Sequence, residues 1–143
     1  MLQSSIEQTI NSLYKEFTTH IYSENNEDVS KQIVDILKKN NLKISFAESI
    51  TGGMMASAIT DVSGASNVLE SSFVTYSNSS KNKNLNVSKE TLDKFGAISE
   101  NTAYEMAKGV KERTQANIGV STTGEAGPNS SETEVGNVFT LSL

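Results

Sequence analysis

The stretch LKISFAESITGGMMASAI, residues 42–59, decides the fold, because it contains a complete passage from strand to helix. Apolar side chains alternate with Lys43 and Ser45 at its start, which predicts a short strand. Gly52-Gly53 then opens a helix whose small side chains permit close packing against a sheet. The hydroxyl group of Ser49 therefore stands at the turn between a strand and a helix.

The chain beyond this stretch continues the alternation of strands and helices. Serine is a typical N-cap residue, and two serines introduce helical patterns. The predicted elements are a turn centred on Gly64, a strand over 68–76, a polar loop over 77–84, a helix from Ser88 to Gly96, a helix that starts at Ser99, a strand over 118–122, a loop over 123–133 and a strand over 136–143.

Two helices are predicted before the central stretch. Residues 4–20 carry one apolar stripe at helical spacing, and residues 29–37 begin a second helix that ends near Asn40-Asn41. A polar segment, residues 23–28, separates the two helices. We therefore expect residues 1–27 to form an N-terminal helix and linker, and residues 28–143 to form the single main domain.

The order of the elements predicts where the functional loops meet. Strands one, two and three are separated by helices, which favours parallel pairing through right-handed crossovers. The carboxyl ends of the three strands then lie at one edge of the sheet, where open α/β sheets bind ligands. Ser49, residues 76–81 and residues 123–128 follow these ends, so we expect them to converge.

Composition excludes several classes of chemistry and partner. The 143 residues contain no cysteine and one histidine, so disulfides, a cysteine nucleophile and a zinc cluster are not expected. The net charge of −5 argues against nucleic acid as the main partner. No apolar run is long enough to span a membrane and no secretory signal is evident, so we predict a cytoplasmic protein.

The predicted edge of the sheet carries the groups that metal-free amide hydrolysis requires. Ser49 supplies a nucleophile, and Lys81 is a candidate base if burial lowers its pKa. Tyr76 is a candidate to pass the proton or to orient the amine. The N–H groups of Thr51, Gly52 and Gly53 are expected to be free at the helix start and to bind an oxyanion or a phosphate.

Each of these residues also has an ordinary structural interpretation. A serine before Thr-Gly-Gly is commonly a helix cap, and a tyrosine at the end of a strand commonly packs against its neighbours. A lysine in a polar loop is commonly a solvated charge. Spacing alone does not decide between these interpretations and catalysis.

Five blocks of sequence together resemble the CinA C-terminal domain family. They occur in the family's order over residues 28–143. The blocks are Glu48-Ser49-x-Thr51-Gly52-Gly53, Gly64-Ala65-Ser66, Phe73-Val74-Thr75-Tyr76-Ser77-Asn78-x-x-Lys81, Gly96-Ala97-x-Ser99-Glu100 and Thr123-Gly124-x-Ala126-Gly127-Pro128. Residues 14–24 also resemble the segment that joins this domain to a larger N-terminal domain in long family members, and that larger domain is not in this sequence.

The resemblance implies both a fold and an activity. The fold is a three-layer α/β/α sandwich with a mixed, mainly parallel sheet, in which strand one lies between strands two and three and strand four is antiparallel. The activity is hydrolysis of the carboxamide of nicotinamide mononucleotide to nicotinic acid mononucleotide and ammonia. No cofactor or metal is implied. Ser49 is the implied nucleophile, Lys81 the general base and Tyr76 its partner. The implied substrate-binding residues are Thr51, Gly52, Gly53, Ser77, Asn78, Thr123, Gly124 and Gly127.

Three features depart from the family pattern. Ile50 replaces a frequent cysteine, and Glu125 replaces an apolar residue in the loop expected to face the phosphate. Glu125 is expected to repel that phosphate, to point to solvent or to pair with Lys81. The sequence also ends at Leu143, where family members continue through another strand and a long helix. We expect a second copy of the chain to cover the exposed apolar surface, which predicts a homodimer.

Two other functions remain open at this stage. One is a nucleotide-binding paralogue without turnover, which Glu125 and the shortened end favour. The other is a scaffold that assembles through its N-terminal helix. The three residues Ser49, Tyr76 and Lys81 favour the enzyme, because a pure binder does not require all of them.

Overall fold

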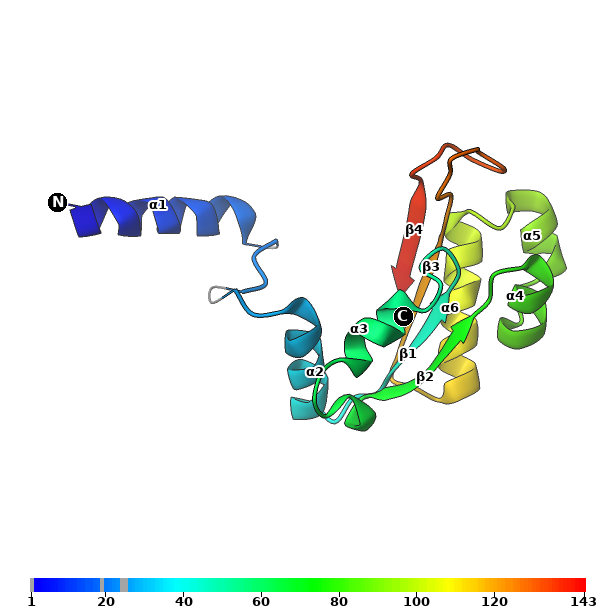
Figure 1. Cartoon of the computed structure of the whole chain (residues 1–143), viewed down its shortest axis with the longest axis horizontal. Coiled ribbons are helices and arrows are strands. Elements are labelled where there is room, and N and C mark those ends of the chain that lie inside the picture. Colours follow the sequence, from blue (N-terminus) through cyan, green and yellow to red (C-terminus); the bar gives the residue numbers. More distant parts are fainter. Residues whose placement is uncertain (1, 19, 24–25) are drawn as a thin grey trace.

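The computed structural model describes residues 2–18, 20–23 and 26–143. Its elements form a central sheet with helices on both faces (Figure 1). In chain order they are α1 (Leu2–Phe17), α2 (Val29–Lys39), β1 (Ile44–Glu48), α3 (Met54–Thr60), the 3₁₀ helix η1 (Ala65–Asn67), β2 (Leu69–Val74), α4 (Asn78–Leu85), α5 (Lys89–Phe95), α6 (Glu100–Thr114), β3 (Ile118–Gly124) and β4 (Val138–Ser142).

The sheet has the strand order β2-β1-β3-β4. β1 pairs in parallel with both β2 and β3, and β4 pairs antiparallel with β3, as the resemblance implied. Glu48 at the end of β1 is level with Val74 of β2 and Thr122 of β3. The carboxyl ends of the three parallel strands therefore meet at one edge of the sheet, as the alternation of strands and helices predicted.

Two apolar cores lie on opposite faces of the sheet and define the three layers. Successive strand residues point to opposite faces, so Phe46 and Ala47 belong to different cores. The core of Phe46 includes residues of α2, α3 and η1, and the core of Ala47 includes residues of α4, α5 and α6. Every residue of β1 is buried, because this strand lies between β2 and β3 and is covered by a core on each face.

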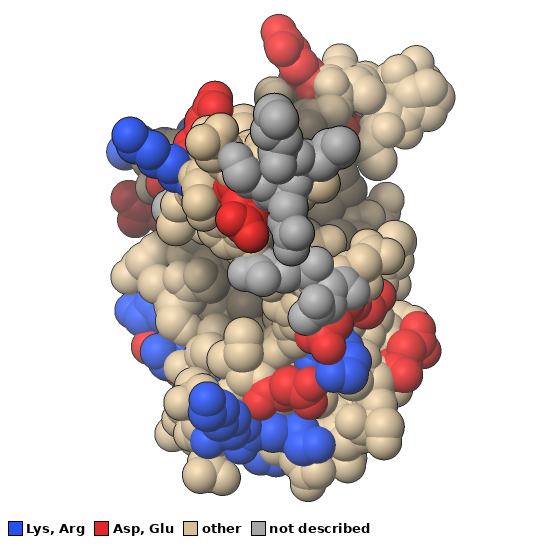
Figure 2. Space-filling view, turned by 90° about the vertical axis from the view of Figure 1, so that its left-hand side faces the viewer, with Lys and Arg blue, Asp and Glu red and all other residues tan. Residues whose placement is uncertain are grey.

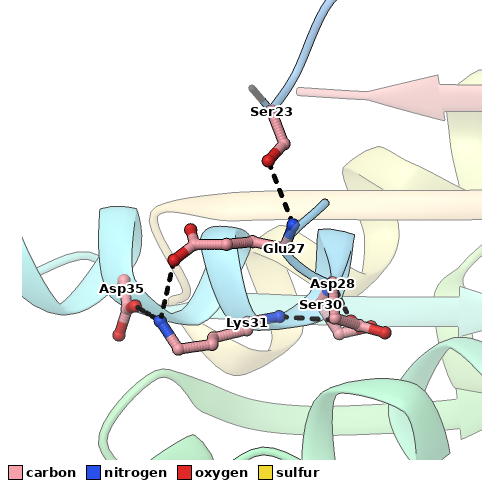
Figure 3. Close-up of polar contacts among 6 residues, drawn as sticks. All are labelled: Ser23, Glu27, Asp28, Ser30, Lys31 and Asp35. Atoms are coloured by element: carbon pink, nitrogen blue, oxygen red, sulfur yellow. Dashed lines mark hydrogen bonds and ion pairs between the residues drawn. The ribbon is translucent and has the colours of Figure 1, made fainter. Parts of the chain in front are cut away.

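The start of α2 is fixed by local polar contacts (Figure 3). The carboxylate of Asp28 accepts hydrogen bonds from the backbone N–H groups of Ser30 and Lys31, as an N-cap does. The amine of Lys31 lies 2.8 Å from Asp35 and 3.9 Å from Glu27. These pairs are exposed, so they contribute little stability compared with the burial of Val34 and Leu37 on the opposite side of the helix.

Helix α1 extends away from the sheet in Figure 1. Its apolar stripe is exposed, with Ile6, Ile10, Leu13 and Phe17 each more than two-fifths accessible. The predicted helix over 4–20 is confirmed as far as Phe17, while Thr19 lies outside the described residues. Figure 2 views the molecule from the α1 side and shows basic as well as acidic side chains on this face.

One predicted loop is a helix. Residues 77–84 were expected to be a loop, but α4 covers Asn78–Leu85. The side chain of Ser77 caps its start by accepting from the N–H of Ser80. Only Lys81 and Leu85, one turn apart, are buried on this otherwise polar helix, so an apolar pattern could not reveal it. This helix determines the direction of the Lys81 side chain.

Candidate active site

A cavity of about 270 Å³ lies where the ends of the three parallel strands meet. It is bounded by the turn after β1, the start of α4, the turn before α6 and the loop after β3. The lining residues are Ser49, Ile50, Tyr76, Ser77, Asn78, Lys81, Ala97, Ile98, Thr123, Gly124, Glu125, Ala126, Gly127, Ser131 and Glu132. A larger groove, about 710 Å³, runs along α6 next to the end of α4 and contains none of the predicted site residues.

Lys81 and Ser49 form the centre of this cavity. The Nζ atom of Lys81 lies 3.0 Å from Ser49 Oγ and donates further hydrogen bonds to the carbonyl oxygens of Thr75 at 2.9 Å and Tyr76 at 3.3 Å. Lys81 is 1% exposed and Ser49 is 8% exposed. The amine is thus held against the hydroxyl group by two backbone carbonyls of the β2–α4 connection.

Burial lowers the pKa of the Lys81 amine, and the negative charge of Glu132 opposes this change in part. A lower pKa increases the neutral fraction of the amine at a given pH, and only a neutral amine can accept a proton from a hydroxyl group. The pair therefore has the geometry and the electrostatics of a nucleophile with its base.

The phenol of Tyr76 makes no hydrogen bond to the Lys81 amine. Its side chain borders the cavity, but the residue is 77% exposed, and its contact with Lys81 is through the backbone carbonyl. Within the described part of the chain the phenol oxygen makes no hydrogen bond. The orientation of the amine, which was one expected role of Tyr76, comes from main-chain atoms of Thr75 and Tyr76.

Glu48 is a buried carboxylate that sequence reasoning assigned no role. It is 0% exposed and lies directly before Ser49. Its Oε2 accepts from the hydroxyl group of Thr51 at 2.7 Å and from the N–H groups of Gly53 and Met55 at 3.0 Å. Its Oε1 accepts from the N–H of Ala56 at 3.0 Å and the hydroxyl group of Ser72 at 3.1 Å.

Burial by itself would raise the pKa of Glu48, but the hydrogen bonds that it accepts outweigh burial and hold this pKa below its usual value. An ionised carboxylate therefore joins the end of β1 to the first turn of α3. A charged residue at the end of a buried strand is the sequence signal that points to such a group.

The glycine N–H groups are not free as expected. The N–H of Gly52 donates to the Ser49 carbonyl at 3.1 Å, and the N–H of Gly53 donates to Glu48. Neither glycine borders the cavity, and Thr51 does not border it either. The expectation of free donors at Gly52 and Gly53 was wrong because the Ser49 carbonyl and the Glu48 carboxylate already accept these two hydrogen bonds.

The remaining predicted residues do border the cavity. Ser77 and Asn78 lie at the start of α4, and Thr123, Gly124 and Gly127 lie at the end of β3 and in the following loop. The hydroxyl group of Thr123 donates to the Ala97 carbonyl at 2.7 Å and so joins the β3 end to the turn before α6. Ala97 and Ile98 complete the wall of the cavity on that side.

Glu125 neither points to solvent nor pairs with Lys81, and its expected repulsion of a phosphate stays a prediction. Its carboxylate accepts from the N–H of Ser131 at 2.8 Å, the Ser131 hydroxyl group at 2.7 Å and the N–H of Glu132 at 3.1 Å. The residue is 8% exposed, so it does not point to solvent. The hydrogen bonds from Ser131, Glu132 and Thr133 lower the pKa of Glu125. The carboxylate therefore holds its own loop together.

The described residues were also compared with the requirements of a metal site and of a membrane-spanning helix. Across residues 2–18, 20–23 and 26–143, no group of three or more His, Cys, Asp and Glu side chains is arranged to hold a metal ion. In the same part of the chain, no helix combines the length and apolar character needed to cross a membrane.

Comparison with known sequences places this chain among proteins with CinA in their names. A family profile described as the CinA C-terminal domain matches residues 26–141. The chain is 46% identical over 117 residues to a CinA-like protein of Prochlorococcus marinus, which covers 82% of the chain and 28% of that relative. It is 49% identical over 109 residues to a CinA-like protein of Kosmotoga olearia, which covers 76% of the chain and 26% of that relative. The chain thus spans under a third of these relatives.

Solved structures give the same result for the fold. The competence/damage inducible protein CihA of Agrobacterium tumefaciens has a TM-score of 0.77 and 43% identity, over 79% of this chain and 70% of that one. A CinA superfamily protein of Escherichia coli has a TM-score of 0.75 and 29% identity, over 86% of this chain and 80% of that one.

Proposed function

Because the chain belongs to the CinA C-terminal domain family, we propose that it hydrolyses the carboxamide of nicotinamide mononucleotide to nicotinic acid mononucleotide and ammonia. The substrate is the one that the family resemblance implies. The observation that carries the proposal is the buried contact of 3.0 Å between Lys81 Nζ and Ser49 Oγ. A lysine with a lowered pKa beside a serine hydroxyl group is a known arrangement for acyl transfer.

In this proposal Lys81 and Ser49 perform the reaction in two stages. Neutral Lys81 takes the proton of the Ser49 hydroxyl group while Oγ bonds to the carboxamide carbon. Lys81 then returns the proton to the amide nitrogen, the C–N bond breaks and ammonia leaves. Water, deprotonated by Lys81, attacks the resulting ester, which releases the carboxylic acid and restores the Ser49 hydroxyl group.

The oxyanion requires donors other than those first expected. The N–H groups of Gly52 and Gly53 are already bonded, so the turn after β1 can supply main-chain donors only from its residues that border the cavity. Ser49 and Ile50 are those residues. Glu48 would act indirectly, because it holds the turn that carries the nucleophile.

The decisive experiment measures ammonia and nicotinic acid mononucleotide after incubation of the protein with nicotinamide mononucleotide. We expect both products in equal amounts. The test variant is Lys81→Met, which removes the proposed base. Its matched control is Lys83→Met, which removes an exposed lysine of the same helix. Absence of product with wild-type protein, or equal rates for the two lysine variants, would contradict the proposal.

A nucleotide-binding protein without turnover is the second candidate. The occupied N–H groups of Gly52 and Gly53 favour it, because they remove two expected oxyanion donors. Glu125 no longer favours it, because this carboxylate is bonded within its own loop. Saturable binding of the mononucleotide without release of ammonia would support this second candidate.

A further inference from the structure

A second carboxylate, besides that of Glu125, borders the cavity that contains the Lys81–Ser49 pair. Glu132 lies in the loop after β3, and its Oε2 accepts hydrogen bonds from the N–H groups of Ala97 at 2.6 Å and Ile98 at 3.2 Å. Gly96, directly before these N–H groups, has φ +78°, which favours glycine, and a Cβ atom there would lie 2.6 Å from this oxygen and displace it. Nothing in the sequence around Glu132 indicated a role for it.

The position of Glu132 is fixed from two sides. Its carboxylate is bonded to the turn before α6, and its own N–H donates to the buried carboxylate of Glu125 at 3.1 Å. Glu125 also binds Ser131, the preceding residue, through two further hydrogen bonds. The loop therefore presents the Glu132 charge at a defined point on the wall of the cavity and not as a freely moving side chain.

Three charged residues line the cavity, one lysine and two glutamates: Lys81, Glu125 and Glu132. Glu125 is bonded within its loop, and Lys81 has a reduced affinity for its proton because it is buried. Glu132 is an exposed residue that lines the same cavity, and its charge acts on the Lys81 amine. The part of the cavity wall formed by the loop after β3 is therefore negative.

We infer that Glu132 makes the site selective for a substrate whose ring carries a positive charge. This inference rests on the proposed function, in which the reacting carboxamide is attached to a pyridinium ring. With the carboxamide at Ser49, the cationic ring lies in the field of the Glu132 carboxylate. Hydrolysis turns the neutral carboxamide into an anion, and the same carboxylate then favours release of the product.

The expected size of the effect follows from the exposure of Glu132. An accessible carboxylate a few ångströms from a cation is screened by water, so removing its charge should change affinity by about three- to tenfold. Glu132→Gln removes the charge but keeps an oxygen that can accept from the N–H groups of Ala97 and Ile98. The variant therefore separates electrostatic recognition from the structural role of the side chain.

The test compares two ligands that differ in ring charge. Nicotinamide mononucleotide has a cationic ring, and its reduced dihydropyridine form has the same carboxamide, ribose and phosphate on a neutral ring. Dissociation constants are measured by calorimetry in a Ser49→Ala background, so that no turnover interferes. We expect Glu132→Gln to weaken binding of the cationic form about three- to tenfold and to leave binding of the neutral form unchanged. Glu134→Gln, an exposed carboxylate of the same loop outside the cavity, is the matched control.

The outcomes separate this inference from the proposed function. Equal losses for both ligands in Glu132→Gln, or equal affinities for both in the chain that keeps Glu132, would overturn the inference even if the wild-type protein releases ammonia. A selective loss for the cationic ligand would support it even if the wild-type protein releases none, in which case only the amidase proposal fails.

Discussion

The Lys81 amine lies 3.0 Å from the Ser49 hydroxyl oxygen, although the two residues are 32 positions apart in the chain. Two elements produce this contact. The β1–α3 turn presents Ser49, and helix α4 directs Lys81 back toward the end of β2. The carbonyl oxygens of Thr75 and Tyr76 fix the amine on its other sides.

Replacing the proposed nucleophile should abolish turnover without disturbing the fold. Ser49→Ala removes one oxygen from a buried side chain, and we expect ammonia release to fall on the order of 10³-fold or more. Ser57→Ala, on the exposed side of α3, should retain full activity. Circular dichroism should show the same thermal transition for both variants. Deamidation at the wild-type rate by Ser49→Ala would exclude Ser49 as the nucleophile.

The rate should rise with pH through the lowered pKa of Lys81. Burial lowers this pKa from the ordinary value of 10.5, and the base acts only when neutral, so the rate should reach a plateau at a pH below 10.5. Glu132→Gln removes the opposing charge and should move the midpoint to lower pH. A pH–rate profile of kcat/KM measures both effects, and a midpoint that does not move in Glu132→Gln would exclude the coupling.

The lowered pKa of Lys81 should also make the stability of the fold depend on pH. Between the folded pKa of Lys81 and 10.5 the unfolded chain binds more protons, so the free energy of unfolding should rise with pH in this window. Lys81→Met should remove that rise, whereas Lys83→Met should keep it. Denaturant titrations at several pH values provide the measurement, and identical slopes in the two variants would contradict the prediction.

Glu48→Gln should destabilise the protein and impair turnover together. The amide NH₂ group would face donors that now bind the carboxylate, and one poorly satisfied buried group costs about 1–3 kcal/mol. The pKa of Glu48 is lowered from 4.5, so its contribution is present above pH 4.5 and is lost as the pH falls through the folded pKa. Urea unfolding from pH 3 to 7 measures this, and Glu70→Gln, an exposed carboxylate of β2, is the control. Equal stability of the two variants at pH 7 would refute a supporting role for Glu48.

Glu125→Ile should raise the KM for the mononucleotide. The variant leaves the N–H groups of Ser131 and Glu132 without their acceptor and so loosens the loop that borders the cavity. Glu125→Gln keeps one acceptor oxygen and should give an intermediate KM. Steady-state kinetics at fixed pH distinguish the variants. A lower KM in Glu125→Ile would mean that this carboxylate repels the phosphate after all.

The apolar stripe of α1 should mediate a homodimer. Ile10 and Leu13 are 46% and 48% exposed, and a second copy of the same stripe would remove both from water. Ile10→Asp combined with Leu13→Asp should shift the protein to a monomer in multi-angle light scattering. Ser12→Asp, on the same helix, adds a charge outside the stripe and should leave the dimer intact. A monomer for the unaltered chain would exclude the prediction.

Local patterns in the sequence were sufficient for most of the framework. The alternation from Leu42 to Phe46 predicted β1, and serines 88 and 99 predicted the starts of α5 and α6. Such signals are local, because a strand or a helix cap depends on residues a few positions apart. The order of the elements then led to the correct edge of the sheet, because parallel strands with helical crossovers align their carboxyl ends.

The tertiary structure alone decided which groups face the site. Glu48 accepts from the N–H of Gly53, Glu125 turns into its own loop, and Glu132 bonds to a backbone 35 residues away. Glu48 and Glu125 accept mainly from donors three to eight positions along the chain, whereas Glu132 accepts from the distant turn before α6. A buried carboxylate must find such donors or lose its charge. The sequence by itself determined which chemical groups are present near the sheet edge. The packing of the β1, β3 and α4 ends determined which of these groups meet, because hydrogen-bond partners are chosen by proximity in space and not by distance along the chain.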